Sequence, residues 1–259
     1  CRFILIDNYS KSRTGSGFFS ILKTKHKSLL SIKRKLSLSN IFRESEKMLV
    51  ELGSELNNSI FLEGGPRLEI VYQCCELSIE HGVAILSLLE IKRDISALAL
   101  FRIQFEAVVR AYWLLMVASN QEIQKFELNN ADDLLKNIKI PTAVEMITKL
   151  ENIVEIAHIV EIFKEFKFYS LKHLHSIVHT GRNSLIQKRA GLADEQMLVI
   201  IKQVNGFITM AAQILLRHAG KEKYIHHIHA QYRNCFQMQS DITVEQKAEI
   251  DKRYQKALT

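Results

Sequence analysis

Turn-forming residues are scarce in this chain, which has 2 prolines and 10 glycines among 259 residues. Antiparallel sandwiches and barrels need a tight turn between most pairs of strands and are typically rich in both residue types. Their scarcity argues against an all-β fold and favours long helices. A chain of this length suits one large domain that can bury a sizeable core.

Cysteines and long apolar runs are also sparse. The chain has 4 cysteines without metal-type spacing, and the adjacent Cys74 and Cys75 are poorly placed to bridge each other. We therefore expect a reducing, cytoplasmic environment and no metal or other cofactor. The most apolar segment, residues 95–118, is interrupted by charged side chains and so falls short of the ~18 to 20 apolar residues of a membrane span. No membrane span is predicted.

Positive charge is concentrated at the N-terminus. Residues 1–40 contain nine Lys and Arg and one acid, Asp7, whereas the whole chain carries +7, so the rest is nearly neutral. The basic balance therefore describes this arm rather than the body of the protein. We predict that residues 1–40 form a basic, poorly ordered arm and that residues 41–259 form a single helical bundle domain.

Hydrophobic periodicity predicts an all-α fold, a bundle of about six to eight helices with a long buried central helix. The helices are expected over residues 41–57, 68–91, 94–118, 153–178 and 194–219, with shorter ones opening at 119 and 142 and an amphipathic one at 243. The segment 94–118 is apolar almost all round, which is typical of a helix at the centre of a bundle.

Capping signals place several helix ends. Ser119 and Thr142 are each followed three residues later by Glu, which predicts two capping boxes. Asp94 and Asp194 are expected to cap the helices that follow them. Gly181 is expected to end the helix before it, and residues 182–193 to form a basic loop.

Three charges at helical spacing stand out on the central segment: Arg102, Glu106 and Arg110. Residues four apart share a helix face, so Glu106 is expected between two guanidiniums. Unpaired buried charge is very costly, so these groups should have partners. One interpretation is a structural ion ladder. The other is that an Arg holds a phosphate or carboxylate while Glu106 orients it. Trp113 is expected in the core.

Two histidines, His175 and His179, share a face near the end of another predicted helix. A zinc-type H-E-x-x-H motif would need Glu at position 176, where this chain has Ser, so no metal site is predicted. Neutral imidazole suits acid and base chemistry near physiological pH, although a helix-end His held by local carbonyls is the alternative. The candidate catalytic residues are His179, His175 and Glu106. The candidate anion-binding residues are Arg102, Arg110 and Arg182.

A third group of histidines lies in a polar stretch: His226, His227 and His229. Neither an acid nor a cysteine lies within this group to complete a metal site. We interpret them as surface residues.

Residues 100–114, LFRIQFEAVVRAYWL, and residues 174–181, LHSIVHTG, resemble uncharacterised bacterial all-helical proteins that share R-x-x-x-E-A and V-H-x-G patterns. More distantly, the chain resembles helical bundles of the HEPN type, many of which are metal-independent ribonucleases of toxin and antiphage systems that act as dimers. That resemblance implies a homodimer and RNA as substrate. In HEPN proteins an Arg precedes the catalytic His by a few residues, whereas here Arg182 follows His179, so the general fold is what the resemblance transfers.

Three functions therefore stay open. The first, which the sequence favours, is an interaction or scaffold protein without catalysis. The second is a HEPN-like ribonuclease that uses His179 with Arg102 or Arg182. The third is a protein that binds a small anionic ligand through the same arginines. Whether the chain is an enzyme is not decided by its sequence.

Overall fold

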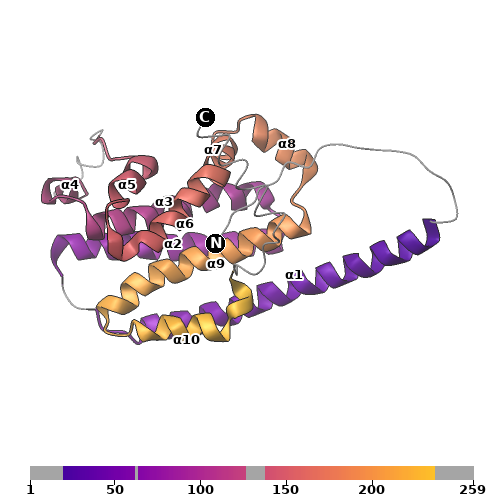
Figure 1. Cartoon of the computed structure of the whole chain (residues 1–259), viewed down its shortest axis with the longest axis horizontal. Coiled ribbons are helices and arrows are strands. Elements are labelled where there is room, and N and C mark those ends of the chain that lie inside the picture. Colours follow the sequence, from indigo (N-terminus) through magenta and orange to yellow (C-terminus); the bar gives the residue numbers. More distant parts are fainter. Residues whose placement is uncertain (1–19, 62–63, 127–137, 237–259) are drawn as a thin grey trace.

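The structure, a computed structural model, describes residues 20–61, 64–126 and 138–236, with side chains described from residue 37 onward. Within these ranges every regular element is helical and no strand occurs (Figure 1). The predicted all-α bundle is confirmed. Helix α1 crosses residue 40, the predicted boundary between arm and bundle, without interruption.

The helices run in the following order: α1 Ser20–Asn57, α2 Gly65–Glu90, α3 Asp94–Met116, α4 Asn120–Gln124, α5 Ala143–Leu150, α6 Ala157–Phe166, α7 Lys172–Val178, α8 Arg182–Ala190, α9 Asp194–His218 and α10 Lys223–Gln231. Short 3₁₀ segments, η2 Val154–Ile156 and η4 Arg233–Cys235, precede α6 and follow α10. A π-helical segment, η3 Lys167–Leu171, joins α6 to α7.

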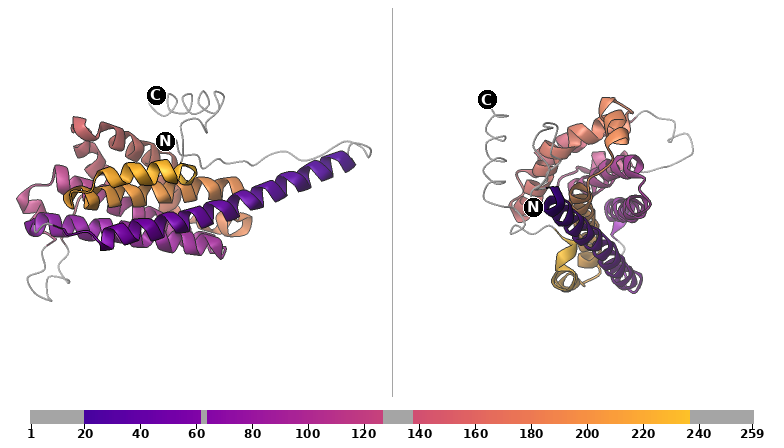
Figure 2. Two further views of the ribbon diagram at one scale, coloured as in Figure 1. Left: turned by 90° about the horizontal axis from the view of Figure 1, so that it is seen from below. Right: turned by 90° about the vertical axis from the view of Figure 1, so that its right-hand side faces the viewer.

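Helices α2, α3 and α9 pack against one another at the centre of the bundle. Helix α1 lies along α9 and projects beyond the rest of the bundle at its N-terminal end, while α10 lies beside α1 (Figures 1 and 2). On the other side, α5 and α7 pack against α3. One face of α3 therefore packs against α2, and another face lies against α7 and α8.

Aromatic rings fill the centre of the core. Phe105 stacks on Phe166 with ring centroids 4.2 Å apart, and Phe207 of α9 packs edge-on against Phe166 at 5.2 Å. Trp113 is fully buried, as expected from the sequence. Burial of such side chains stabilises the fold by roughly 1.5 to 3 kcal/mol each. The rings therefore connect α3, α6 and α9 in one core.

Two buried amides join helices that are distant in sequence. Gln104 of α3 donates from Nε2 to the carbonyl of Val204 on α9 at 3.1 Å. Asn205 of α9 donates from Nδ2 to Ser45 Oγ at 2.7 Å and to the carbonyl of Cys235 at 3.1 Å. Buried polar groups need such partners, so these bonds fix how α1, α3 and η4 sit on α9.

Local capping signals gave mixed outcomes. Both predicted capping boxes are present, at Ser119 with Glu122 and at Thr142 with Glu145. Asp94 does not cap α3. It is the first helical residue, and its Oδ2 accepts a hydrogen bond from the backbone N–H of Leu192 at 3.1 Å. The prediction is wrong because this carboxylate ties α3 to the segment before α9.

The other predicted cap, Asp194, is also wrong. Helix α9 starts at Asp194 itself, and Gln196 reaches back to the backbone N–H of Ala193 instead. Two further elements differ from expectation. The predicted loop over 182–193 is mostly helix α8, and α10 occupies the stretch that was interpreted only as polar. The predicted helix opening at 243 lies outside the described residues.

Helix α9 is long and apolar enough to cross a membrane by length and composition, and 67% of that window is buried inside the bundle. Among the described residues it is the one helix that meets this criterion. Packing in the core accounts for the same composition, so the feature is weak evidence for a membrane span.

Candidate functional site

Arg102 of α3 lies at the centre of the candidate site. Its Nε donates to Glu106 Oε1 at 2.7 Å, one helical turn along α3. Its Nη1 lies 2.5 Å from His175 Nδ1 on α7. The Arg102 and Glu106 side chains keep 19% and 28% of their exposure, so the pair lies at the edge of the core. The structure therefore joins the two motifs that the sequence singled out separately.

The Arg102 contact determines the tautomer of a neutral His175 ring. A guanidinium has hydrogen-bond donors and no acceptor, so Nδ1 of His175 must be the acceptor. In the neutral imidazole the proton is then on Nε2, the nitrogen on the far side of the ring. Glu106 accepts a hydrogen bond from the Arg102 guanidinium, and the same guanidinium donates to the His175 ring. His175 is thus fixed as a donor through Nε2.

His179 lies beside His175, with ring centroids 4.4 Å apart, and both side chains are exposed. This confirms that the two residues share a face. His179 follows the last residue of α7, where the chain turns sharply into α8. Thr180 adopts a left-handed conformation with φ of 53°, the role expected of Gly181.

Gly181 serves this turn through close packing instead. A Cβ at this position would lie 2.6 Å from Ser176 Oγ, and the Gly181 N–H donates to the carbonyl of Ser176 at 2.7 Å. Ser176 Oγ also accepts from the N–H of Asn183 at 3.2 Å. These bonds hold the turn that carries His179 and that starts α8 at Arg182.

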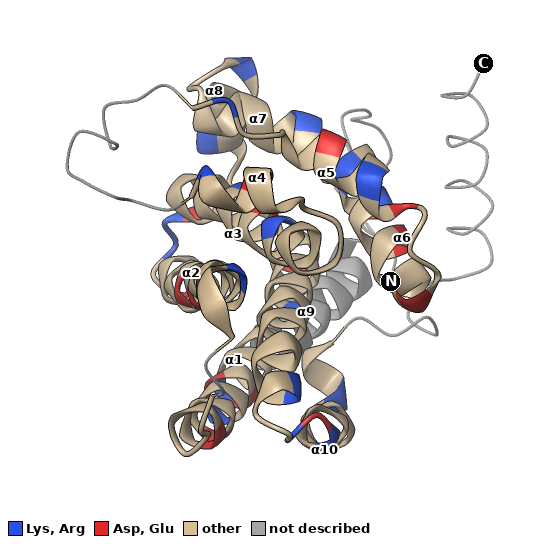
Figure 3. Cartoon of the chain, turned by 90° about the vertical axis from the view of Figure 1, so that its left-hand side faces the viewer, with Lys and Arg blue, Asp and Glu red and all other residues tan. Residues whose placement is uncertain are grey.

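The α7–α8 region has an unusual charge distribution. Residues 166–193 contain no Asp or Glu. The same stretch carries the cations Lys167, Lys172, Arg182, Lys188 and Arg189. Figure 3 shows blue Lys and Arg on α8 at the end of the molecule where α8 packs against α7. Glu106 is the one acid of the candidate site, so its carboxylate is the one group of the site that would repel a bound anion.

Arg110 does not join this cluster, so the predicted ladder is wrong at that end. Within the described residues its buried Nε has no hydrogen-bond partner, and Glu106 pairs with Arg102 alone. The Arg110 guanidinium instead lies close enough to the Cys74 thiol on α2 to lower its pKa, although burial raises that pKa to about 11 overall. Arg182 is exposed, and no hydrogen bond links it to Arg102 within the described part of the chain.

The third histidine group lies on α10, away from these residues. His227 Nε2 lies 3.2 Å from Glu51 Oε1, and the His229 ring packs on Phe236 with centroids 4.5 Å apart. Among the described residues, no three His, Cys, Asp or Glu side chains are arranged to hold a metal ion.

Glu51 of α1 is a polar centre that the sequence did not reveal. Its carboxylate accepts hydrogen bonds from Tyr232 at 2.7 Å, Gln231 at 2.9 Å and Tyr224 at 3.2 Å. The Tyr232 bond, followed by those from Tyr224 and His227, lowers the pKa of Glu51. Helical spacing of Tyr224, His227 and Gln231 was the available signal, but nothing in sequence pointed to a partner on α1.

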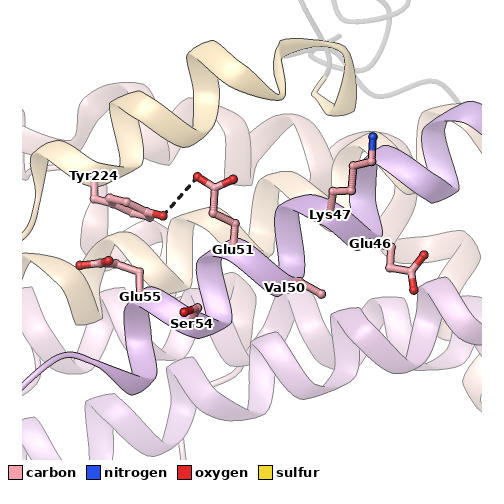
Figure 4. A pocket seen from close by; sticks show the side chains of 7 residues that line it. All are labelled: Glu46, Lys47, Val50, Glu51, Ser54, Glu55 and Tyr224. Carbon is pink, nitrogen blue, oxygen red and sulfur yellow. Dashed lines mark hydrogen bonds between the residues drawn. The ribbon is translucent and has the colours of Figure 1, made fainter.

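Figure 4 shows the shallow groove around Glu51, with the Tyr224 bond dashed and the side chains of Glu46, Lys47 and Glu55 spaced along α1. Two of these charges are already paired. Glu55 contacts Lys221 at 2.7 Å, and Lys47 contacts Glu44 at 2.9 Å. The Glu51 contacts therefore dock α10 on α1, and the α3–α7 residues remain the leading site.

Comparison with curated proteins and with solved structures finds no match. A family model, "Family of unknown function (DUF6988)", matches residues 75–238. The match covers more than half of the chain and includes α3, with Arg102 and Glu106, and α7, with His175. The chain belongs to this family of unknown function.

Proposed function

We propose that the α3–α7 cluster, defined as Arg102, Glu106, His175 and His179, binds a phosphate group of RNA. The observation that carries this proposal is the Arg102 guanidinium, fixed between Glu106 and His175 beside two exposed imidazoles. Its Nη2 makes no hydrogen bond within the described residues. A guanidinium with a free edge is a strong, directional donor to phosphate oxygens.

The surrounding charge supports an anionic ligand. Glu106 balances the charge of Arg102, so net attraction must come from the neighbouring segment. That segment, residues 166–193, supplies Arg182 and four other Lys and Arg without any acid. Such a one-sided distribution is typical of a surface that tracks a phosphate backbone. A small anion would contact only part of this basic surface.

The first test measures binding of a fluorescent single-stranded RNA of mixed sequence by anisotropy at several salt concentrations. Arg182→Gln is expected to weaken binding and reduce the salt dependence by about one released counterion. The matched control is Arg217→Gln, because Arg217 is exposed at the end of α9, outside the α7–α8 region. RNA binding that is absent, or equally strong in both variants, would overturn the proposal.

RNA cleavage is the second candidate, favoured by the fixed tautomer of His175 next to His179. Metal-independent cleavage needs a base and an acid at one phosphate. His179 would take the proton of the 2′-hydroxyl as its oxygen attacks phosphorus. His175 would donate a hydrogen bond from Nε2 to a non-bridging phosphate oxygen, and the leaving 5′-oxygen would take its proton from solvent as the P–O bond breaks. The products are a 2′,3′-cyclic phosphate and a 5′-hydroxyl.

The test follows the same RNA on denaturing gels in the presence of a chelator. His179→Asn is expected to abolish cleavage, while His158→Asn on α6 serves as the histidine control. Intact RNA with the wild-type protein would contradict the catalytic role alone. If the RNA is neither bound nor cut, the role of the cluster is to hold α3 and α7 together. The interaction or scaffold role, which includes a homodimer, then becomes the leading hypothesis.

A further inference from the structure

A second cavity lies on the opposite face of the core from α2. It has a volume of about 610 Å³ and is lined by residues of α6, α9, α10 and Phe236. This volume lies within the range of about 300 to 1,000 Å³ that is usual for small-molecule sites. The cavity is separate from the α3–α7 cluster, because none of the four cluster residues lines it.

The walls of the cavity are mainly apolar. Ile159 and Ile162 come from α6, Phe207 and Met210 from α9, and Ile225 from α10. The His229 ring packs on Phe236 and adds to the same wall. Desolvation, followed by the charge of His226, lowers the pKa of His229 and so favours the neutral ring. An apolar ligand body would therefore be well accommodated.

Ionisable groups of one sign surround this apolar space. The charged residues among the described residues that line it are Lys202 and Arg233, and none of the lining residues is acidic. Arg233 is exposed and forms no ion pair within the described part of the chain. An apolar cavity bordered by cations is complementary to a molecule with an apolar body and a negatively charged head.

We propose that this cavity binds a free, monomeric amphipathic carboxylate, with its apolar part between α6 and α9 and its carboxylate at Arg233 and Lys202. The cations would orient the ligand, while burial of its apolar body would supply most of the affinity. The proposal rests on different residues from the RNA site, so each can fail without the other.

Gly206 provides a means of closing the cavity without harming the fold. It lines the cavity in the middle of α9, and a Cβ built on it meets no atom within 4 Å. Gly206→Leu would therefore place a side chain in the empty space, and a helix interior favours Leu over Gly. Gly53→Leu is the matched control, because Gly53 of α1 is equally open and does not line the cavity.

The experiment is calorimetric titration of the full chain with decanoate below its micelle concentration, beside decanol and decyltrimethylammonium as neutral and cationic probes. Decanoate is expected to bind saturably and most tightly of the three, and decyltrimethylammonium to bind most weakly. Gly206→Leu should abolish the signal and Gly53→Leu should keep it. Arg233→Gln should weaken decanoate binding by about two- to fivefold, as expected for a solvent-exposed charge pair, whereas Lys223→Gln on α10 should not.

Circular dichroism and thermal unfolding of each variant confirm that it is folded before titration. Equal binding of all three probes, or decanoate binding that survives Gly206→Leu, would overturn the proposal. So would absence of decanoate binding to the wild-type chain. RNA binding by Gly206→Leu should equal that of the wild type.

Discussion

Arg102 on α3 donates a hydrogen bond to Nδ1 of His175 on α7, although 73 residues separate them in sequence. This bond makes the orientation of an exposed imidazole depend on a side chain rooted in the central helix. Because Glu106 holds the same guanidinium at 2.7 Å, the three groups act as one unit. Any function of His175 therefore depends on Arg102 as much as on the histidine.

Replacing Arg102 tests this unit. Arg102→Gln removes the donor to His175 and the ion pair with Glu106, and we expect a loss of about 1 to 2 kcal/mol in unfolding free energy, because the group is only partly exposed. Nδ1 of His175 should then no longer be held as an acceptor, so its ¹⁵N chemical shift should report a mixture of tautomers. Urea titration and imidazole NMR measure the two effects. Arg93→Gln, at the exposed start of α3, should change neither; unaltered ¹⁵N shifts in Arg102→Gln would contradict the assignment.

The Glu51 contacts predict a pH-dependent stability. Hydrogen bonds, first from Tyr232, lower the pKa of Glu51 in the folded state below the ordinary value for a glutamate. The stabilisation is then fully present above the unfolded pKa and is lost as pH falls through the lower, folded pKa.

Glu51→Gln should therefore cost about 1 to 2 kcal/mol at pH 7, and the difference from the wild type should shrink below about pH 4.5. Chemical unfolding across this range is the measurement. Glu46→Gln, five residues earlier on α1 and without a hydrogen bond in the described structure, should show no such trend. A difference that grows toward low pH would reverse the predicted sign.

Two helical glycines should respond in opposite ways to alanine. A Cβ on Gly82 would lie 2.5 Å from Ile208 Cγ1 and 2.6 Å from Gln104 Nε2, so Gly82→Ala should destabilise the fold by about 1 to 3 kcal/mol. Gly206 has open space, so Gly206→Ala should stabilise it by roughly 0.5 to 1 kcal/mol. Thermal unfolding of both variants tests the close approach of α2, α3 and α9. Similar shifts for the two would show that this approach is not tight.

Asn205 should be among the costliest polar residues to remove. Asn205→Ala leaves Ser45 and the carbonyl of Cys235 without their shared donor in a fully buried position. We expect a loss of about 2 to 4 kcal/mol. Asn183→Ala on α8 offers a less buried asparagine for comparison in the same denaturant titration. A loss below about 1 kcal/mol would mean that neighbouring groups take over these bonds.

The sequence alone predicted the features that depend on neighbours in the chain. The capping boxes at Ser119 and Thr142 need only residues three apart, and both are present. The pairing of Arg102 with Glu106 and the shared face of His175 and His179 follow from four-residue spacing on a helix. Scarcity of proline and glycine was enough to indicate the all-α class.

Tertiary packing decided the rest, because it selects among partners that local spacing leaves equivalent. Arg102 and Arg110 are each four residues from Glu106, yet only Arg102 pairs with it, since α7 lies beside Arg102 and α2 beside Arg110. For the same reason, Asp94 accepts a hydrogen bond from the backbone N–H of Leu192 and does not cap its own helix. Sequence spacing thus determined which groups share a helix face, and only the packing of helices determined which of them meet.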